Sequence, residues 1–282
     1  MEVCKDIASL DEHLKLYENI RNQIGLVPTM GALHAGHISL VKKALAENDI
    51  VIVSIFVNPT QFNNPNDLSR YPRTLERDII QLNHLNDDII VFAPSVKEMY
   101  PDGAISEEYN FKGVASIMEE KFRPGHFNGV ATVVKRLFEI VNPKRAYFGE
   151  KDYQQLFIIK KLVKKEKLPI KIIGCPIVRE HNGLAMSSRN ERLSDNTRYK
   201  ASFIYNILLK IKERFLVEKS GDIKHWVQNQ FKNQELFKLE YIEIVDTNTL
   251  KRIRIKDPEK KYRAFIAVYA EGIRLIDNIA LN

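Results

Sequence analysis

Residues 24–57 read IGLVPTMGALHAGHISLVKKALAENDIVIVSIFV, and this stretch decides the fold. Residues 24–27 form a short apolar run that ends at Pro28. Residues 37–46 place their apolar side chains on one stripe, so we predict a helix there. Residues 49–57 form a nearly continuous apolar run rich in β-branched residues, which is typical of a strand buried on both faces.

The alternation of strands and helices continues to about residue 176. Helices are predicted at residues 74–85, 129–141 and 152–165, and strands at residues 88–92, 146–148 and 170–173. This order predicts an α/β fold with a Rossmann-like, doubly wound parallel sheet. Residues 1–176 are therefore predicted to form the larger domain.

The pattern changes after about Pro176. Helices are predicted at residues 191–217 and 223–232, followed by strands at residues 239–245, 263–269 and 273–276. Helices followed by strands predict a smaller α+β C-terminal domain of residues 177–282.

Composition and charge favour a globular protein that handles small anions. The chain has 282 residues, of which 44% are hydrophobic and 28% charged, close to globular averages. The net charge is +7, but the basic residues are interleaved with 36 acids, so we expect a solvated basic surface and no nucleic-acid partner. The longest apolar run, residues 50–57, is shorter than the roughly 20 residues that span a bilayer, so no membrane partner is expected.

The N-terminus and the cysteines predict a cytoplasmic location. Residues 1–6 are polar and lack the apolar region of a secretory signal. Cys4 and Cys175, the two cysteines of the chain, form neither a disulfide framework nor a metal-binding pair by their spacing.

The junction between the first strand and the first helix suits a phosphate group. Gly31 and Gly36 allow the backbone to approach a ligand closely, and the start of a helix carries partial positive charge. His34 and His37 lie at that start and can donate hydrogen bonds to phosphoryl oxygens. A purely structural pair and a zinc site are the alternatives, although no third zinc ligand is evident. The sequence contains no P-loop motif.

Residues 34–37 resemble the His-x-Gly-His signature of the nucleotidylyltransferase superfamily, which includes class I aminoacyl-tRNA synthetases. The longer string PTMGALHAGH, residues 28–37, resembles the pantothenate synthetase family. The resemblance implies ATP-dependent condensation of (R)-pantoate with β-alanine, through pantoyl adenylate, to give pantothenate, AMP and pyrophosphate. It also implies that Mg²⁺ accompanies ATP and that the enzyme is a homodimer.

Two further segments resemble the same family and carry polar side chains. In residues 56–62, FVNPTQF, Asn58 and Gln61 are neutral amides suited to a hydroxy acid, although Asn-Pro can also simply end a strand. The resemblance implies that Gln61 binds pantoate and β-alanine. In residues 123–129, RPGHFNG, Arg123 and His126 are secondary candidates, and a loop that merely starts a helix is the alternative.

Residues 147–155, YFGEKDYQQ, again join a strand to a helix. Lys151 is a mobile point charge that can hold phosphates, whereas Asp152 can cap the following helix. The resemblance implies that residues 149–152 line the nucleotide and that Gln155 contacts pantoate. Residues 186–190, MSSRN, resemble the Lys-Met-Ser-Lys-Ser phosphate loop of the synthetases and offer many hydrogen-bond donors.

These patterns and the resemblance give the following predicted site. The catalytic residues are His37, His34 and Lys151, of which the family pattern favours His37 over His34. The ATP-binding residues are Met30, Gly31, Ala32, Leu33, His34, Ala35, Gly36, His37, Gly149, Glu150, Lys151, Asp152, Val178, Met186, Ser187, Ser188 and Arg189. The pantoate- and β-alanine-binding residues are Gln61, Gln155 and Asn58. No metal ligand is assigned, because Arg77 stands beside Asp78 where the family can be richer in acids.

Two other functions are weighed against this one. A nucleotidylyltransferase that builds a dinucleotide shares His-x-Gly-His but does not explain Gln61, Gln155 and the whole series of motifs. A non-catalytic RNA-binding protein is suggested by the positive charge, but the sequence lacks aromatic–basic interleaving and a recognised RNA module.

Overall fold

The structure is a computed structural model that describes residues 1–17, 24–111, 117–253 and 255–282. The chain forms two compact units. The first comprises Met1–Phe111, Phe122–Glu150 and Gln154–Pro176, and the second comprises Lys112–Lys121, Lys151–Tyr153 and Ile177–Asn282. The predicted domains, residues 1–176 and 177–282, stay a prediction, because a domain must also fold independently.

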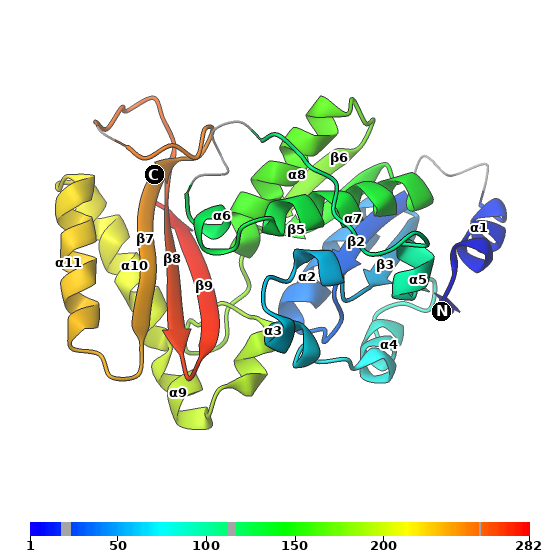
Figure 1. Cartoon of the computed structure of the whole chain (residues 1–282), viewed down its shortest axis with the longest axis horizontal. Helices are drawn as coiled ribbons and strands as arrows, with labels where there is room; N and C mark the ends of the chain where they lie inside the picture. The colour runs from blue at the N-terminus through cyan, green and yellow to red at the C-terminus, as the bar shows by residue number, and fades with distance from the viewer. Residues whose placement is uncertain (18–23, 112–116, 254) are drawn as a thin grey trace. The chain divides into compact units, whose positions relative to one another are not determined.

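A six-stranded parallel sheet forms the centre of the first unit (Figure 1). Its strands are β1 (Glu2–Cys4), β2 (Ile24–Thr29), β3 (Ile50–Ile55), β4 (Ile90–Phe92), β5 (Arg145–Gly149) and β6 (Lys171–Cys175). They lie in the order β1-β4-β3-β2-β5-β6, and every neighbouring pair is parallel. The strand order reverses at β2, which has β3 on one side and β5 on the other. Ligands of such sheets bind beyond the carboxyl ends of the strands at this switch point.

Helices cover both faces of this sheet, as predicted for a doubly wound fold. The helices of the first unit are α1 (Ile7–Lys15), α2 (Ala35–Glu47), α3 (Pro65–Ser69), α4 (Leu75–Asn83), α5 (Val96–Met99), α7 (His126–Val141) and most of α8 (Tyr153–Lys165). Leu26 of β2 packs in one core with α1, α7 and α8, whereas its neighbour Val27 packs in another core with α2 and α4. Successive side chains of a strand point to opposite faces, so a strand covered on both faces is apolar throughout.

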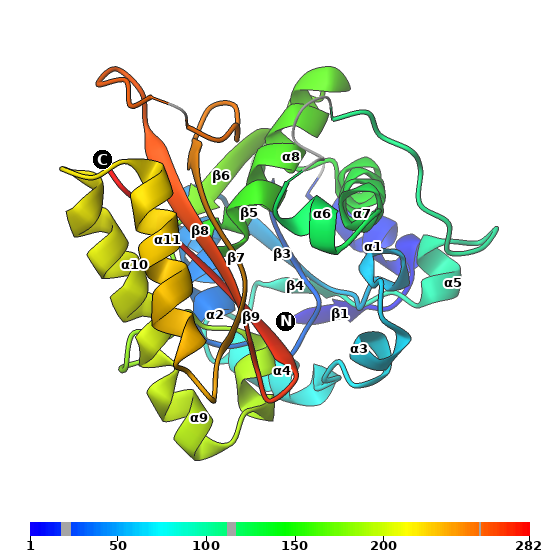
Figure 2. The ribbon, with the colours of Figure 1, turned by 60° about the vertical axis from the view of Figure 1, so that its left-hand side comes forward.

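The second unit contains a three-stranded antiparallel sheet, β7 (Lys238–Asp246), β8 (Tyr262–Ala270) and β9 (Ile273–Ala280), in that order. Helices α10 (Ser202–Phe215) and α11 (Ser220–Lys232) lie against it (Figure 2). Ile207 and Val227 from these helices share a core with Ile244, Ile266 and Leu275 from the three strands. These elements confirm the predicted C-terminal α+β architecture.

The single helix predicted at residues 191–217 is wrong. The chain forms a 3₁₀ turn (Ser188–Arg192), helix α9 (Asp195–Lys200) and helix α10 instead. Ser194 has extended backbone, and its side chain accepts the Thr197 N–H, so it starts a new helix. The apolar periodicity continues across this break, which is why the pattern alone did not show it. Strand β1 was not predicted, because three residues carry no measurable period.

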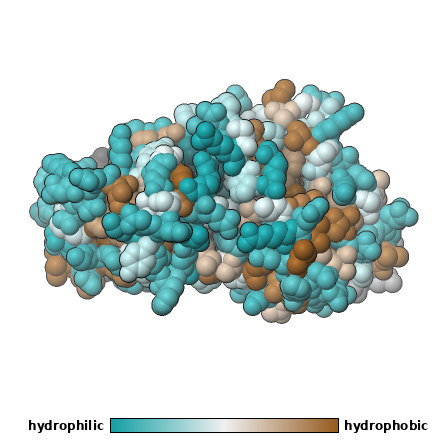
Figure 3. Space-filling view, turned by 90° about the horizontal axis from the view of Figure 1, so that it is seen from below, coloured by the Kyte–Doolittle hydropathy of each residue, from teal (hydrophilic) through white to brown (hydrophobic). Residues whose placement is uncertain are grey.

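The large exposed hydrophobic side chains belong to different elements and include Ile80 of α4 and Tyr199 of α9. On the face drawn in Figure 3, brown hydrophobic patches are separated by teal hydrophilic surface. Within the described ranges, the helices lack the combination of length and apolar character that crossing a bilayer requires.

Candidate active site

The buried carboxylate of Asp78 holds the loop between β2 and α2. Asp78 of α4 is 1% exposed, and its two oxygens accept the N–H groups of Ala32 and Leu33 at 2.9 and 2.8 Å. Gly31 has a φ of +77°, and a Cβ there would lie 3.1 Å from a carboxylate oxygen of Asp78. Burial raises the pKa of Asp78, and the N–H donors oppose this shift. Ala32 and Leu33, both predicted to bind ATP, therefore direct their amides to Asp78.

His34 and His37 lie together at the start of α2. His34 is the N-cap residue, and its Nδ1 accepts the Gly36 N–H at 3.1 Å. The His34 N–H in turn donates to His37 Nδ1 at 3.4 Å, and the two ring centroids are 4.0 Å apart. An Nδ1 that accepts a hydrogen bond carries no proton, so each neutral ring carries its proton on Nε2. Both rings are thus in the tautomer that can donate an Nε2–H to an anionic oxygen.

Gln61 is the last residue of a short 3₁₀ turn, η2 (Pro59–Gln61), and Asn58 directly precedes this turn. The Gln61 amide nitrogen contacts the Met30 sulfur, and its side-chain oxygen accepts from Asn58 Nδ2 at 3.3 Å. Asn58 is 1% exposed, and its own oxygen accepts the hydroxyl of Tyr100 at 2.8 Å. Asn58 therefore shapes the turn, whereas Gln61 is next to a predicted ATP-binding residue.

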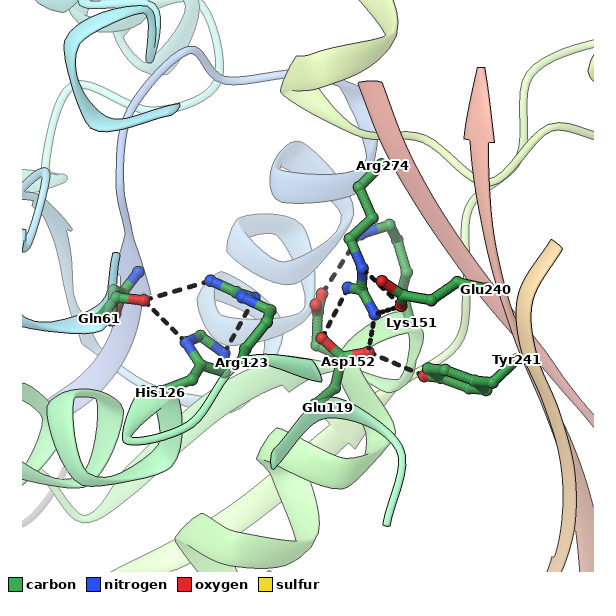
Figure 4. Close-up of polar contacts among 9 residues, drawn as sticks. All are labelled: Gln61, Glu119, Arg123, His126, Lys151, Asp152, Glu240, Tyr241 and Arg274. Atoms are coloured by element: carbon green, nitrogen blue, oxygen red, sulfur yellow. Dashed lines mark hydrogen bonds and ion pairs between the residues drawn. The ribbon is translucent and has the colours of Figure 1, made fainter. Parts of the chain in front are cut away.

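Arg123 and His126, the secondary candidates, both contact the backbone carbonyl of Gln61. His126 Nδ1 lies 2.9 Å and Arg123 Nη2 3.2 Å from this oxygen, and the two side chains contact each other (Figure 4). The structure thus combines two segments that the sequence showed separately, residues 56–62 and 123–129.

The carboxyl end of β5 lies beside β2, at the switch point of the sheet. Gly149 ends β5, and Glu150 begins the short turn that leads into α8. Gln155 lies in the first turn of α8 and is partly exposed, and no hydrogen bond ties its side chain to the part of the chain that the structure describes. Its amide is accordingly suited to a ligand.

In the second unit, Lys151 is fixed by its backbone. Asn278 of β9 donates to the Lys151 carbonyl oxygen at 2.8 Å. The Lys151 ammonium is 3.5 Å from Asp152, the last residue of the turn before α8, and its side chain is 20% exposed. A backbone held by Asn278 and a long, partly exposed side chain suit a cation that follows a phosphate group.

Five more predicted ATP-binding residues lie close to one another in the sequence of the second unit. The Met186 N–H donates to the Val178 carbonyl at 3.0 Å, so these two residues are adjacent. The Ser187 hydroxyl caps the 3₁₀ turn of residues 188–192 by accepting the Arg189 N–H at 3.3 Å. Ser188 is 7% exposed and begins that turn.

Asp277 and Asn278 are functional candidates that the motif series did not include. Asp277 is 4% exposed and forms a bidentate pair with Arg179, at 2.6 and 3.0 Å. Arg179 also stacks on the Tyr205 ring, 3.7 Å from its centroid. Arg179 directly follows Val178, and Asn278 holds Lys151, so both C-terminal residues support predicted ATP-binding positions. The sequence signal for them is that residues 275–278, LIDN, also resemble the pantothenate synthetase family.

A pocket of about 300 Å³ lies within the first unit, beside the β2–α2 loop. It is lined by Met30, Gly31, Ile55, Phe56, Val57, Arg73, Thr74, Leu75, Asp78, Ala93, Pro94, Ser95 and Val96. It includes two predicted ATP-binding residues but neither Gln61 nor Gln155.

Metal ligands were left unassigned from sequence, and the described residues contain no group of three His, Cys, Asp or Glu side chains arranged to hold an ion. Asp78 uses its oxygens on the Ala32 and Leu33 amides. A zinc site at His34 and His37 thus finds no third ligand in residues 1–17, 24–111, 117–253 and 255–282.

The parallel sheet, the switch point between β2 and β5, and the paired histidines at a helix start define a nucleotide-binding α/β protein with a His-x-Gly-His helix start. The family model described as pantoate-beta-alanine ligase matches residues 2–280, and the chain belongs to this family.

Named relatives and solved structures agree with this membership. The pantothenate synthetase of Christiangramia forsetii is 55% identical over 282 residues and covers 100% of both chains. That of Flavobacterium psychrophilum is 54% identical over 270 residues, with 96% of each chain covered. The crystal structure of pantothenate synthetase from Thermus thermophilus matches with a TM-score of 0.91 and 40% identity, over 100% of this chain and 99% of that one.

The pantoate-beta-alanine ligase of Francisella tularensis was solved in complex with beta-gamma ATP and beta-alanine. It matches with a TM-score of 0.78 and 41% identity, over 100% of this chain and 98% of that one. The resemblance drawn from residues 28–37 and the predicted fold class are thereby confirmed.

Proposed function

We propose that this chain condenses (R)-pantoate with β-alanine at the expense of ATP and releases pantothenate, AMP and pyrophosphate. Family membership and the names of its relatives support the reaction. One observation in the structure carries the proposal: His34 and His37 use Nδ1 within the loop, which places a donor hydrogen on each Nε2. Two such donors at a helix N-terminus suit the charge that develops when a carboxylate attacks a phosphate.

The reaction proceeds in two displacements. The pantoate carboxylate attacks the α-phosphorus of ATP, the bond to the bridging oxygen breaks, and pyrophosphate leaves. The neutral amine of β-alanine then attacks the acyl carbon of pantoyl adenylate, AMP leaves, and the amine loses a proton. Because the adenylate is already activated, no side chain becomes a covalent nucleophile. Cys4 and Cys175 are buried, and burial raises the pKa of Cys175 to about 11, so we expect both cysteines to be dispensable for the reaction.

The residue roles follow the predicted site. His34, His37, Lys151, Ser187, Ser188 and Arg189 hold the phosphates, and the remaining predicted ATP-binding residues line the nucleotide. Gln61 and Gln155 bind pantoate, and β-alanine binds beside them. Mg²⁺ would accompany ATP and neutralise part of the phosphate charge, and no protein ligand is assigned to it.

We also propose that the enzyme is cytoplasmic and acts as a homodimer. Its partners are small molecules, and it binds neither nucleic acid nor membrane. Analytical ultracentrifugation of the purified chain tests the dimer. A tight, salt-sensitive RNA complex would instead support the RNA-binding alternative.

The decisive experiment is a coupled AMP-release assay with ATP, Mg²⁺, pantoate and β-alanine, with each component omitted in turn. AMP should form only when all are present. Exchange of labelled pyrophosphate into ATP should require pantoate but not β-alanine, which separates acid activation from nucleotidyl transfer onto a phosphate. No AMP from the complete mixture would overturn the proposal.

A further inference from the structure

Three residues spaced three apart, Arg123, His126 and Gly129, all contact the turn that carries Gln61. Arg123 and His126 reach the Gln61 carbonyl oxygen, as described above (Figure 4). The Gly129 carbonyl accepts the Asn58 side-chain amide at 3.2 Å. A Cβ on Gly129 would lie 2.2 Å from the Thr60 carbonyl oxygen, so helix α7 approaches the turn as closely as a glycine permits.

These contacts fix the tautomer of His126. The Arg123 guanidinium can only donate, so His126 Nε2, 3.2 Å from Arg123 Nη1, must accept. His126 then carries its proton on Nδ1 and donates it to the Gln61 carbonyl, 2.9 Å away. His126 is 7% exposed, so these contacts are made away from bulk water. His34 and His37 carry their protons on Nε2, the opposite tautomer.

The side-chain amide nitrogen of Gln61 is held more loosely than its backbone, whereas its side-chain oxygen accepts from Asn58 Nδ2 at 3.3 Å. Its amide nitrogen contacts the Met30 sulfur, and thioether sulfur is a weak acceptor. A carboxylate or hydroxyl oxygen of a ligand can replace that contact with a stronger hydrogen bond. The backbone of Gln61, by contrast, accepts from both Arg123 and His126. Gln61 thus combines a fixed backbone with an amide that a ligand can readily engage.

We propose that Arg123 and His126 are positioning residues that hold the Gln61 amide in place for pantoate, through the Gln61 backbone carbonyl. This inference rests on the proposed function for the identity of the ligand. It predicts that losing either donor weakens pantoate binding in the ground state and the transition state alike, which raises KM and leaves kcat nearly unchanged.

Two substitutions of His126 test the tautomer requirement. His126→Gln places its amide near the Nε2 position and loses the donor at Nδ1, whereas the shorter His126→Asn places an amide N–H near Nδ1. We expect His126→Gln to raise the KM for pantoate about tenfold, with the KM for ATP changed less than about twofold. His126→Asn should recover most of the wild-type KM. Equal losses in both variants, or a loss confined to kcat, would contradict positioning.

A double-mutant cycle tests the path through Gln61. In a Gln61→Ala background the amide to be positioned is absent, so adding His126→Gln should change the pantoate KM by less than about twofold. Pantoate-dependent pyrophosphate exchange remains measurable at low turnover and supplies the readout. Full multiplication of the two single effects would show that His126 acts independently of Gln61 and would overturn the inference.

Nitrogen NMR of the enzyme with ¹⁵N-labelled histidine measures the tautomer of His126 independently of the reaction. The free enzyme should show a signal of a neutral Nδ1–H imidazole that disappears in His126→Gln. An Nε2–H tautomer or an imidazolium at His126 would overturn the positioning role even if AMP release is normal. Conversely, failure of AMP release in the wild type would overturn the proposed function and leave the tautomer result intact.

Discussion

The two units hold their ATP-binding candidates with buried aspartates that have different partners. In the first unit, Asp78 accepts two backbone N–H groups, those of Ala32 and Leu33. In the second unit, Asp277 accepts two N–H groups of a guanidinium, that of Arg179, next to Val178. Burial raises the pKa of both aspartates, and it is opposed by amide donors at Asp78 and by the Arg179 cation at Asp277.

The difference decides how each arrangement can be broken. The amide donors to Asp78 belong to the backbone, and every residue except proline supplies a backbone N–H. A side-chain substitution can therefore remove only the Asp78 carboxylate from these hydrogen bonds. The ion pair can be broken from either side and also replaced as a whole. Asp78 therefore stabilises the shape of one loop, whereas the Arg179–Asp277 pair carries a second charge that must stay paired.

Breaking the ion pair from one side should have the largest effect. Asp277→Ala leaves the Arg179 guanidinium, whose side chain is 17% exposed, without its carboxylate. We expect the free energy of unfolding to fall by about 3–5 kcal/mol, measured by urea denaturation. The double variant Arg179→Met/Asp277→Leu should recover most of this loss because no charge is left unpaired. A double variant no more stable than Asp277→Ala would show that packing, not charge, dominates.

The second-largest effect is expected when a predicted catalytic hydrogen-bond donor is removed. His37→Ala in the first unit and Lys151→Ala in the second should each lower turnover by about 10²–10³-fold, because each removes a donor to charge that develops in the transition state. Pantoate-dependent pyrophosphate release measures the effect. Lys164→Ala, which removes an exposed cation near the end of α8, is the matched control and should stay close to wild type. Full pyrophosphate release by either variant would contradict the assigned role.

The features that could be predicted from the sequence are those that follow a regular pattern of side chains along a strand or helix. Residues 24–27 and 49–57 were predicted as β2 and β3 because strands covered on both faces are apolar throughout. His34 and His37 were predicted at a helix start because glycines flank them between a strand and a helix. The helix at residues 191–217 was predicted wrongly because Ser194 breaks it without interrupting the apolar pattern.

Features that depend on backbone partners could not be predicted. Asp78 accepts from the Thr74 hydroxyl and from two main-chain amides, and main-chain amides carry no signal of their own in the sequence. The one available signal was an aspartate among the apolar positions of α4, between Leu75 and the buried Leu82. His126 and Arg123 were similarly identified only as loop residues, because their partner is the carbonyl of Gln61 rather than a side chain.

A smaller loss is expected when the other aspartate is removed. Asp78→Ala leaves the Ala32 and Leu33 amides without their carboxylate, and we expect the free energy of unfolding to fall by about 2–3 kcal/mol. Water can reach part of the loop, which keeps the loss below that of Asp277→Ala. The KM for ATP should rise as well, because His34 follows Leu33 directly. Unchanged ATP binding would show that the loop keeps its shape without Asp78.

The smallest effect distinguishes burial from hydrogen bonding at Asp78. An aspartate in the unfolded chain has a pKa of about 3.9. Because burial raises the pKa of Asp78 above this, the folded chain keeps a proton on Asp78 at pH values where the unfolded chain has begun to lose it. This contribution to stability is fully present below the unfolded pKa and is lost as the pH rises through the folded pKa. Asp78→Asn cannot titrate, so the wild type should lose stability relative to that variant as the pH rises above the unfolded pKa of about 3.9. If the wild type instead gains stability relative to Asp78→Asn as the pH rises, the Ala32 and Leu33 donors outweigh burial and lower the pKa of Asp78.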